Sequence, residues 1–332
     1  MNREAAIAAF LARAGYAGAQ VAPLAQDASF RRYWRIAGGP RPAVLMDAPP
    51  PEEVHPFLVI GAHLGGLGFS VPEVLAADEG EGLVLLEDLG DDLFSTLLSP
   101  RTGPAMFDAA VDLLAEMQRA PVPAPGNLPD WDVGTMAAAA EATLLDWWWP
   151  ATFGAPASDA VRQEFTLALL QMLFPLSDAT PVFVHRDFFA GNLIWLPERE
   201  GVRRVGLLDF QSAARGHPAY DLASLIEDAR RDIPPELAER CVARFLAARP
   251  ELDPQAFRDA LAICKAQRHL RVAAQWVRLA RRDGRPHYLA HGPRTWRLLE
   301  GALSHPAAAP LAEAFDRWIP PERRGNPPEP GA

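Results

Sequence analysis

The chain has 332 residues, of which 49% are hydrophobic and 22% are charged, and its formal net charge at pH 7 is −10. These values are those of a globular protein with room for one large domain or two lobes. The negative charge argues against a nucleic-acid backbone as partner, because basic surfaces bind nucleic acids.

We expect a cytoplasmic protein that acts as a monomer and does not enter a membrane. No apolar run approaches the ~18 residues that a transmembrane helix needs. The two cysteines, Cys241 and Cys264, lack the spacing of a disulfide framework or a zinc site. Residues 5–12 are apolar, as in a signal peptide. However, Glu4 is acidic and the apolar residues that follow have helical spacing, which favours an amphipathic helix over residues 2–15.

The first 90 residues predict a small sheet with one main helix. Residues 21–36 predict two strands around a tight turn, since large side chains alternate with polar ones from Phe30 onward. Further strands are expected at 43–46, 71–75 and 83–86, and a helix at 52–67. Gly90 then marks a boundary.

Beyond Gly90 the chain is mostly helical. Helices are predicted over 93–98, 104–119, 133–147, 157–174, 235–249, 253–282, 294–304 and 310–318, with another that opens at Tyr220. Short paired strands are expected at 193–196 and 205–208. The sequence therefore predicts an α+β protein with an antiparallel-sheet lobe over 1–89, a hinge at 87–90, a helical lobe over 90–319 and a disordered proline-rich tail over 320–332.

The chemistry is concentrated in an H-x-D-x-x-x-x-N stretch that contains His185, Asp187 and Asn192 and follows the apolar run 182–184. A second acidic residue, Asp209, ends another apolar strand. Protein kinases have this layout, in which an Asp accepts the acceptor hydroxyl's proton while Asn and a second Asp hold Mg²⁺ on the ATP phosphates. We predict these roles for Asp187, Asn192 and Asp209, and a two-lobed protein-kinase-like fold. The alternative is a polar loop beside an N-capped helix.

Two further residues are predicted to support this loop. His185 is expected to fix the loop structurally instead of acting as a base. Asp221, at the start of a helix, is expected to be an N-cap or a brace for the catalytic loop, two roles that are compatible.

Several stretches outside the motif carry a family resemblance: residues 27–35 (DASFRRYWR), 44–50 (VLMDAPP), 85–90 (LLEDLG), 208–211 (LDFQ), 220–225 (YDLASL) and 267–272 (QRHLRV). With them the chain resembles the aminoglycoside phosphotransferase and choline-kinase-like family, and within it the anomeric N-acetylmuramate/N-acetylglucosamine kinases of peptidoglycan recycling. The resemblance implies transfer of the ATP γ-phosphate to the anomeric hydroxyl of one of these amino sugars, giving the sugar 1-phosphate.

The nucleotide site is expected at the first hairpin and at the hinge. The candidates are Ala28, Ser29, Phe30, Arg31 and Arg32 at the hairpin, and Glu87, Asp88 and Leu89 at the hinge, where backbone groups meet adenine. An ordinary surface hairpin is the alternative, because the turn lacks glycines.

The third strand lacks the lysine with which kinases hold the phosphates. It carries Met46 and Asp47 instead, and the only lysine, Lys265, comes much later. The phosphate charge would then fall to Mg²⁺ and to Arg31 or Arg32, through their forked donors. Arginines on a solvated strand face are the competing interpretation.

Acceptor contacts are predicted from Trp147, Trp148, Gln211 and Arg268. Aromatic faces pack against sugar rings, although tryptophans in mid-helix more often belong to the core. Arg268, with Gln267 and Arg271, could pair with a substrate carboxylate, or could lie on a solvated helix face. Two alternative functions stay open: a phosphotransferase for aminoglycosides or other amino alcohols, and a nucleotide-binding pseudokinase. The sequence does not rank the two amino sugars.

Overall fold

The structure is a computed structural model that describes residues 2–24, 31–122 and 128–328. The chain forms two compact units. The first comprises Met1–Leu113 and Ala190–Ala213, and the second comprises Leu114–Phe189 and Ala214–Ala332. The first unit thus extends past the lobe boundary predicted at 87–90 and takes in a later segment. The chain crosses from one unit to the other within the H-x-D-x-x-x-x-N stretch.

The first unit is built on a five-stranded antiparallel sheet with the order β1–β2–β3–β5–β4. The predicted hairpin is present, with Gln20 paired to Ala37 and Pro23 to Trp34, while its turn at 25–30 lies outside the described residues. The strand predicted at 71–75 begins only at Val74, because Pro72 has no N–H for a ladder. The strands are β1 (Gln20–Pro23), β2 (Arg32–Ala37), β3 (Ala43–Asp47), β4 (Val74–Asp78) and β5 (Leu83–Glu87).

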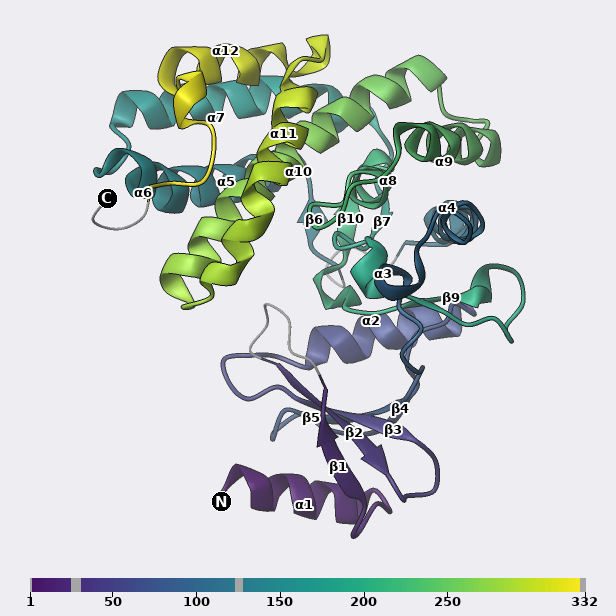
Figure 1. Cartoon of the computed structure of the whole chain (residues 1–332). Coiled ribbons are helices and arrows are strands. Elements are labelled where there is room, and N and C mark those ends of the chain that lie inside the picture. The colour runs from purple at the N-terminus through teal and green to yellow at the C-terminus, as the bar shows by residue number, and fades with distance from the viewer. Residues whose placement is uncertain (1, 25–30, 123–127, 329–332) are drawn as a thin grey trace. The chain divides into compact units, whose positions relative to one another are not determined.

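The two faces of this sheet have different partners. Cross-strand pairs place Arg32 with Asp47, Trp34 with Leu45 and Ile36 with Ala43 on one face, since side chains alternate along a strand. Figure 1 shows α1 (Arg3–Arg13) and α2 (His55–Gly66) on opposite sides of the sheet. The face toward α1 is a compact apolar core of Phe10, Leu11, Tyr16, Ile36, Ala43, Leu45, Leu83 and Leu85.

The opposite face carries Tyr33 and Arg35 from β2 and Val44 and Met46 from β3. It is the face turned toward α2 (Figure 1). The register therefore decides which polar side chains of β2 lie on the α2 side of the sheet.

A later hairpin completes the first unit. It consists of β8 (Leu193–Trp195) and β9 (Val205–Leu207), as predicted. The Ser70 hydroxyl donates to the Arg203 carbonyl at 2.7 Å, and the Leu207 N–H donates to the Ser70 carbonyl at 2.8 Å. Phe57 of α2 stacks on Phe210 with ring centroids 4.7 Å apart, so the segment after β9 is fixed against α2. Short helices α3 (Phe94–Leu97), η3 (Ala190–Asn192), η4 (Gly201–Arg204) and η5 (Phe210–Ser212) also belong to this unit.

The second unit contains a three-stranded sheet with the order β6–β10–β7. β7 (Val182–Val184) is the apolar strand predicted before the motif, and it is buried throughout. β10 (Ala214–Gly216) runs antiparallel to β7 and parallel to β6 (Asp130–Trp131). The sequence does not predict β6 or β10, because two or three residues are too few to show alternation.

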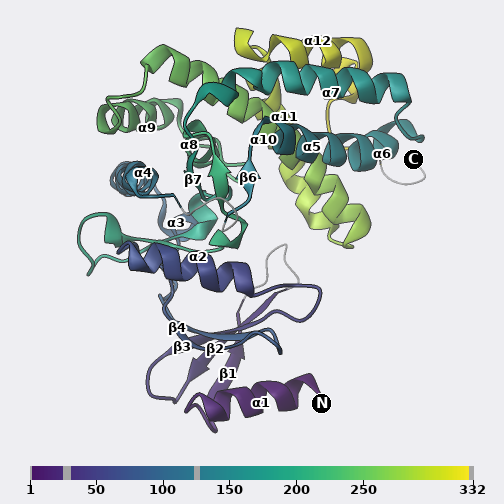
Figure 2. The same cartoon turned by 180° about the vertical axis from the view of Figure 1, so that it is seen from behind.

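Helices form the rest of the second unit, and α10 (Pro254–Arg282) is the longest of those described. Asp253 caps its N-terminus by accepting from the Ala256 N–H, and Pro254 occupies the first helical position. α10 packs against α5, α8 and α11, and α12 lies along α7 (Figure 2). The helices are α5 (Val133–Thr143), α6 (Trp149–Phe153), α7 (Asp159–Leu173), α8 (Ala219–Ile226), α9 (Pro235–Ala248), α11 (Gly292–Leu303), α12 (Ala309–Trp318), and α4 (Gly103–Arg119), which spans the division between the units; the 3₁₀ segments are η2 (Phe174–Asp178), η6 (Pro286–His291), η7 (Pro306–Ala308) and η8 (Pro321–Arg323).

The helix predicted over 133–147 is not uniform. α5 ends at Thr143 and continues as a π-helix, η1 (Leu144–Trp148). The wider π turn leads into α6, and Trp148 is fully buried within it. Its ring lies 5.0 Å from that of Trp296.

The prediction of a disordered tail does not hold for residues 320–328, and residues 329–332 lie outside the described part. Trp148 Nε1 donates to the Gly325 carbonyl at 2.7 Å, and Asn326 Nδ2 donates to the Leu289 carbonyl at 2.8 Å. A proline-rich composition suggested disorder, but these contacts fix the segment to the helical unit. Among the described helices, none combines the length and the apolar character that a membrane crossing requires.

Candidate active site

The catalytic loop is held by Asp221. Its Oδ2 accepts the His185 N–H at 2.6 Å and its Oδ1 accepts the Arg186 N–H at 2.9 Å. The N-cap of α8 is Pro218, so of the two roles considered for Asp221 the structure has the brace and not the N-cap. The clamp fixes the backbone directly before Asp187.

Two features of this loop show how tightly it is constrained. Arg186 has a φ of 72°, a left-handed conformation that is uncommon for arginine. Asp221 is fully buried, and burial raises its pKa to about 7 although the two N–H donors favour the charged form. His185 is also fully buried, with its ring edge-on to Phe188 at 5.9 Å, a place that suits its predicted structural role.

Arginines surround Asp187 in the second unit. The Arg186 guanidinium lies 3.9 Å from the centroid of the Trp131 ring, and that of Arg271 lies 6.0 Å from the same centroid. Burial and the charge of Arg271 lower the pKa of Arg186, and the carboxylate of Asp187 acts in the opposite direction. Trp131 has no sequence signal, since it stands in a two-residue strand.

Arg268, predicted as an acceptor contact, lies in the interior of the same unit. Its Nη1 donates to the Glu227 carbonyl at 3.4 Å, and burial lowers its pKa. Gln267 is fully buried and its Nε2 donates to the Met136 carbonyl at 2.8 Å. A solvated helix face is therefore the wrong interpretation for both residues, whereas Arg271 is half-buried.

The metal candidates lie together in the first unit. The Leu208 N–H donates to the Asn192 carbonyl at 3.0 Å, which closes the β8–β9 hairpin and brings Asn192 beside the start of the Asp209 segment. Asp209 has a φ of 58°, and its Oδ1 accepts from Gln211 Nε2 at 2.7 Å. A carboxylate and an amide oxygen are the ligand types that Mg²⁺ takes, so these residues fit that ion. The Gln211 amide therefore lies against Asp209, and its role as a substrate contact stays a prediction.

Arg31 and Arg32 lie in different surroundings. Arg31 is buried, with Nε 3.2 Å from Glu52 Oε2 and Nη2 donating to the Glu53 carbonyl at 3.2 Å. Arg32 lies on the face toward α1, where its Nη2 is 2.8 Å from Asp47 Oδ2. Asp47 also accepts from Arg3 Nε at 2.9 Å, so it neutralises charge on that face.

Tyr33 connects Arg31 to the metal candidates. Burial raises the pKa of Tyr33 to about 12, with the carboxylate of Asp209 acting in the same direction and Arg31 opposing it. Arg31, Tyr33 and Asp209 are therefore close neighbours within the first unit. Tyr33 lies in one of the stretches that carry the family resemblance, residues 27–35, but nothing in the sequence assigns it a role.

The place of the kinase lysine is apolar in this chain. Met46 is buried on the α2 side of β3, and its Sδ accepts from the Tyr33 hydroxyl at 3.5 Å. Lys265 lies in the second unit, where its Nζ is 2.6 Å from Glu227 Oε1. Among the described residues, two arginines lie on the α2-facing side: Arg31 lies beside Tyr33, whereas Arg35 forms an ion pair with Asp88.

At the hinge, side chains are engaged in ion pairs. Glu87 Oε1 lies 2.9 Å from Arg199 Nη2, and Asp88 Oδ2 lies 2.7 Å from Arg35 Nε. Asp88 Oδ1 also accepts the Gly90 N–H at 2.9 Å. These ion pairs engage the side chains of Glu87 and Asp88, and the contact of the backbone here with an adenine edge stays a prediction.

The tryptophan triplet is mainly structural. Trp148 is fully buried and Trp149 is 8% exposed, while Trp147 is half-buried. The structure corrects the prediction of Trp148 as a substrate contact, because a side chain at the centre of the helical core cannot reach a ligand. A position in the middle of a predicted helix does not by itself distinguish a tryptophan of the core from one that contacts a ligand.

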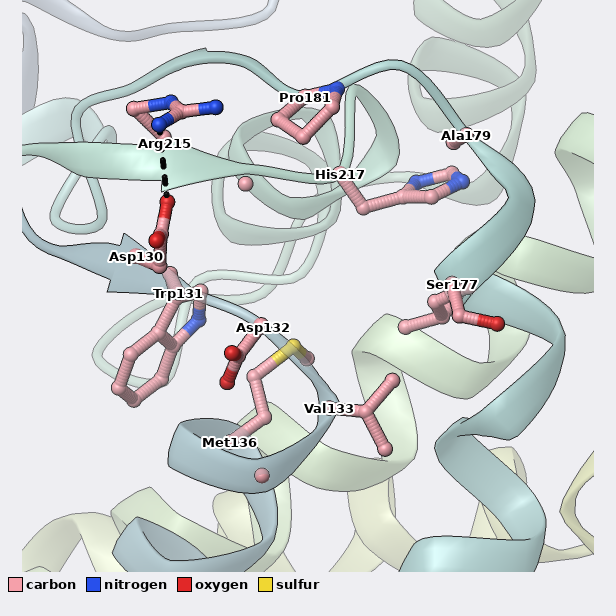
Figure 3. Close-up of a pocket in the computed structure, with 13 residues that line it drawn as sticks. Asp130, Trp131, Asp132, Val133, Met136, Ser177, Ala179, Pro181, Arg215 and His217 are labelled. Atoms are coloured by element: carbon pink, nitrogen blue, oxygen red, sulfur yellow. Dashed lines mark ion pairs between the residues drawn. The ribbon is translucent and has the colours of Figure 1, made fainter. Parts of the chain in front are cut away.

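A cavity of about 300 Å³ in the second unit is lined by Trp131, the ring against which Arg186 packs, but by no residue of the catalytic loop itself (Figure 3). Asp130 and Arg215 face each other across its edge at 3.6 Å, and His217 lines it. In the sheet, Gly216 pairs with Val182 and Ala214 with Val184, so His217 is at the end remote from His185. Burial lowers the pKa of His217 to about 4, which leaves the imidazole neutral at pH 7.

Comparison with known proteins identifies the family. Residues 20–258 match the model of the family described as "Phosphotransferase enzyme family". The chain belongs to this family. It is 38% identical to the N-acetylmuramate/N-acetylglucosamine kinase of Caulobacter vibrioides, over 97% of this chain and 98% of that one. It is 33% identical to the protein of the same name from Pseudomonas aeruginosa, over 89% and 87% of the two chains.

Among solved structures, the fold is similar to a choline/ethanolamine kinase family protein from Mesorhizobium loti. The TM-score is 0.66 at 15% sequence identity, over 96% of this chain and 100% of the other. The predicted family resemblance and kinase-like α+β fold are thereby confirmed, and the protein is a phosphotransferase.

Proposed function

We propose that the protein transfers the γ-phosphate of ATP to the anomeric hydroxyl of N-acetylmuramate or N-acetylglucosamine, giving the sugar 1-phosphate. The observation that carries this proposal is the Asp187 loop, clamped by Asp221, in a chain similar over nearly its whole length to kinases of that name. Such a reaction belongs to peptidoglycan recycling in the cytoplasm, and a monomer suffices for it.

Each candidate residue has a distinct task in this proposal. Asp187 orients the sugar hydroxyl and accepts its proton, which a hemiacetal gives up more readily than an ordinary alcohol. Asn192 and Asp209 hold Mg²⁺, which, when bound, neutralises charge on the phosphates. Arg31 adds a forked donor on the same side, in place of the missing lysine.

The surroundings of Asp187 argue against an aminoglycoside as acceptor. Aminoglycosides are cations and call for carboxylates around the reacting hydroxyl. Instead, Arg186, Arg268 and Arg271 lie near Asp187. The pseudokinase alternative is disfavoured by the presence of Asp187 together with Asn192 and Asp209, since a protein that only binds nucleotide needs no base.

A turnover panel tests the proposal. The full chain is incubated with Mg-ATP and N-acetylmuramate, N-acetylglucosamine, aminoglycosides or small amino alcohols, and ADP release is followed. Phosphorus NMR then identifies the hydroxyl that carries the product phosphate. We expect a 1-phosphate from at least one of the two amino sugars. Turnover restricted to aminoglycosides or amino alcohols, or ATP binding without turnover on any acceptor, would overturn the proposal.

A further inference from the structure

Two arginines beside Asp187, Arg186 and Arg271, have no role in the proposed reaction so far. Arg186 and Arg271 approach one ring, that of Trp131, to 3.9 and 6.0 Å from its centroid. Both guanidinium groups are therefore held within a few ångströms of a shared wall. Arg186 directly precedes Asp187, so this pair lies beside the residue that would receive the acceptor hydroxyl.

The hydrogen-bond partner of Arg271 is a neutral amide. Its Nη1 donates to the Gln275 amide oxygen at 3.2 Å. Trp131 supplies an aromatic face, with the Tyr220 ring 5.7 Å from it. In the part of the chain that the structure describes, no carboxylate forms an ion pair with Arg271. A guanidinium placed in this way presents its fork to an incoming anion.

The charges of the cluster repel one another, and the carboxylate of Asp187 offsets part of this repulsion. The positive charge of Arg271 is among the causes that lower the pKa of Arg186 and of Arg268. Arg268 is 3% exposed, so water screens it little. An anionic group brought between Arg186 and Arg271 would relieve this repulsion, whereas a neutral group of the same shape would not.

We propose that Arg271 and Arg186 form a subsite for a carboxylate on the acceptor, so that the protein prefers N-acetylmuramate to N-acetylglucosamine. This inference rests on the proposed function and deepens it. The two sugars share the ring, the acetamido group and the anomeric hydroxyl. They differ by the lactyl ether, whose carboxylate is the one group that an arginine fork can distinguish. The relatives' shared name covers both sugars, and the cluster gives a physical reason for ranking them.

The test compares kcat and KM for both sugars in the full-length protein and in Arg271→Met. We expect the wild type to have the higher kcat/KM for N-acetylmuramate. In Arg271→Met the value for N-acetylmuramate should fall about 10- to 100-fold, the range for losing a charge-assisted hydrogen bond, mainly through KM. The value for N-acetylglucosamine should change by less than about twofold. Arg271→Lys should recover part of the loss, because lysine keeps the charge but not the fork.

A substrate-side arm needs no variant. The methyl ester of N-acetylmuramate removes the charge of the acid and adds one methyl group, so the wild type should use it about 10- to 100-fold less well than the acid. Acid and ester should then be used alike by Arg271→Met, which is the coupling expected of a direct contact. Calorimetric titration of the sugars into the protein provides the corresponding affinities without turnover. Arg258→Met is the matched control, because Arg258 lies on the same helix, is exposed and pairs with Glu239.

The outcomes separate this inference from the function it rests on. Equal losses for both sugars in Arg271→Met would give Arg271 a structural role only and overturn the subsite. Equal use of acid and ester by the wild type would overturn it as well. If the wild type phosphorylates neither sugar, the proposed function itself fails, and a sugar carboxylate then has no place at this cluster.

Discussion

Asp187 is the residue on which the proposed reaction depends most directly. Asp187→Asn keeps the shape of the side chain and removes its ability to accept a proton. We expect kcat to fall about 10²- to 10⁴-fold, the usual contribution of a positioned base. The Asp221 clamp acts on the backbone of His185 and Arg186, so the fold should not change. Stopped assays of ADP release measure the loss, and calorimetry should show ATP affinity within about twofold of the wild type.

Asp130→Asn is the matched control for this substitution. Asp130 belongs to the same unit, is exposed and lies 3.6 Å from Arg215. An exposed pair of this kind contributes at most about 1 kcal/mol, so kcat should stay near that of the wild type. Near-normal turnover by Asp187→Asn would remove the base from the mechanism.

Arg31 and Arg32 are the two candidates for the role of the missing lysine, and substitutions can distinguish them. Arg31 lies near Tyr33 and Asp209, whereas Arg32 is paired with Asp47 on the α1 face. We expect Arg31→Met to weaken ATP binding about tenfold or more, as for the loss of one charge-assisted contact to phosphate. Adenosine, which has no phosphate, should bind the variant as it binds the wild type.

Arg32→Met is the natural comparison, since it removes the neighbouring arginine of the same hairpin. Its ATP affinity should change by less than about twofold, because Arg32 is exposed and faces away from Asp209. Fluorescence titration of both variants with ATP and adenosine decides the matter. A larger loss of ATP affinity for Arg32→Met than for Arg31→Met would mean that Arg32, and not Arg31, contacts the phosphates.

At the scale of single residues, the sequence predicts the site residues whose spacing along the chain is fixed by a motif. It does not predict the ones whose placement depends on strand register. Asp187, Asn192 and Asp209 are recognisable because a motif fixes their spacing. Choosing between Arg31 and Arg32 requires the β2–β3 pairing, since adjacent residues of a strand lie on opposite faces. Trp148 is a similar case, because the π turn that buries it has no sequence pattern of its own.

At the scale of elements, α8 and α10 are joined by a partly buried polar cluster around Glu227. His269 Nε2 lies 2.7 Å from Glu227 Oε2, and Lys265 Nζ lies 2.6 Å from Oε1. Burial alone would raise the pKa of Glu227, but His269 and Lys265 outweigh it and lower the pKa to about 2. Burial lowers the pKa of His269, so at pH 7 its neutral ring donates to the carboxylate while Lys265 supplies the charge.

This cluster predicts a pH dependence of stability. A carboxyl group whose pKa is depressed in the folded state stabilises the fold above its ordinary pKa of 4.5, and the contribution disappears as the pH falls toward 2. Glu227→Gln should therefore lower the free energy of unfolding by roughly 1–3 kcal/mol at pH 7, and by less at pH 3. Urea unfolding at pH 7, 5 and 3 measures the difference. Exposed Glu300→Gln serves as control, and a deficit that is the same at all three pH values would contradict the charge assignment.

The accuracy of the predicted elements follows their length. α9, α10 and α12 agree with the predictions within one or two residues, because their apolar periodicity extends over several turns. β6 and β10 have two and three residues, and each depends on pairing with a strand far along the chain. Such pairing is a tertiary property, so no local pattern reveals it.

At the scale of the whole molecule, the chain is divided within its own catalytic motif. Phe189 is the last residue of the second unit before the motif continues, and Ala190–Ala213 belongs to the first unit. Asp187 and the metal candidates are thus parts of different compact units, although Asn192 is only the fifth residue after Asp187. A lobe boundary at a single hinge, as composition suggests, does not describe this interleaving. The sequence marks where helices replace strands, but not which later hairpin joins an earlier sheet.

The C-terminal segment provides a final prediction, because composition and structure disagree about it. Arg324 Nη2 lies 2.7 Å from Asp316 Oδ1, and the Gly325 carbonyl is the acceptor for the buried Nε1 of Trp148. Deleting residues 320–332 leaves that indole N–H without its acceptor in the core, at a cost of about 1–3 kcal/mol. A truncation that removes only residues 329–332 keeps these contacts and is the control. Thermal unfolding should therefore show a midpoint several degrees lower for the longer deletion and unchanged for the shorter one. Equal midpoints for the two truncations would show that the segment contributes nothing to stability, as expected of a disordered tail.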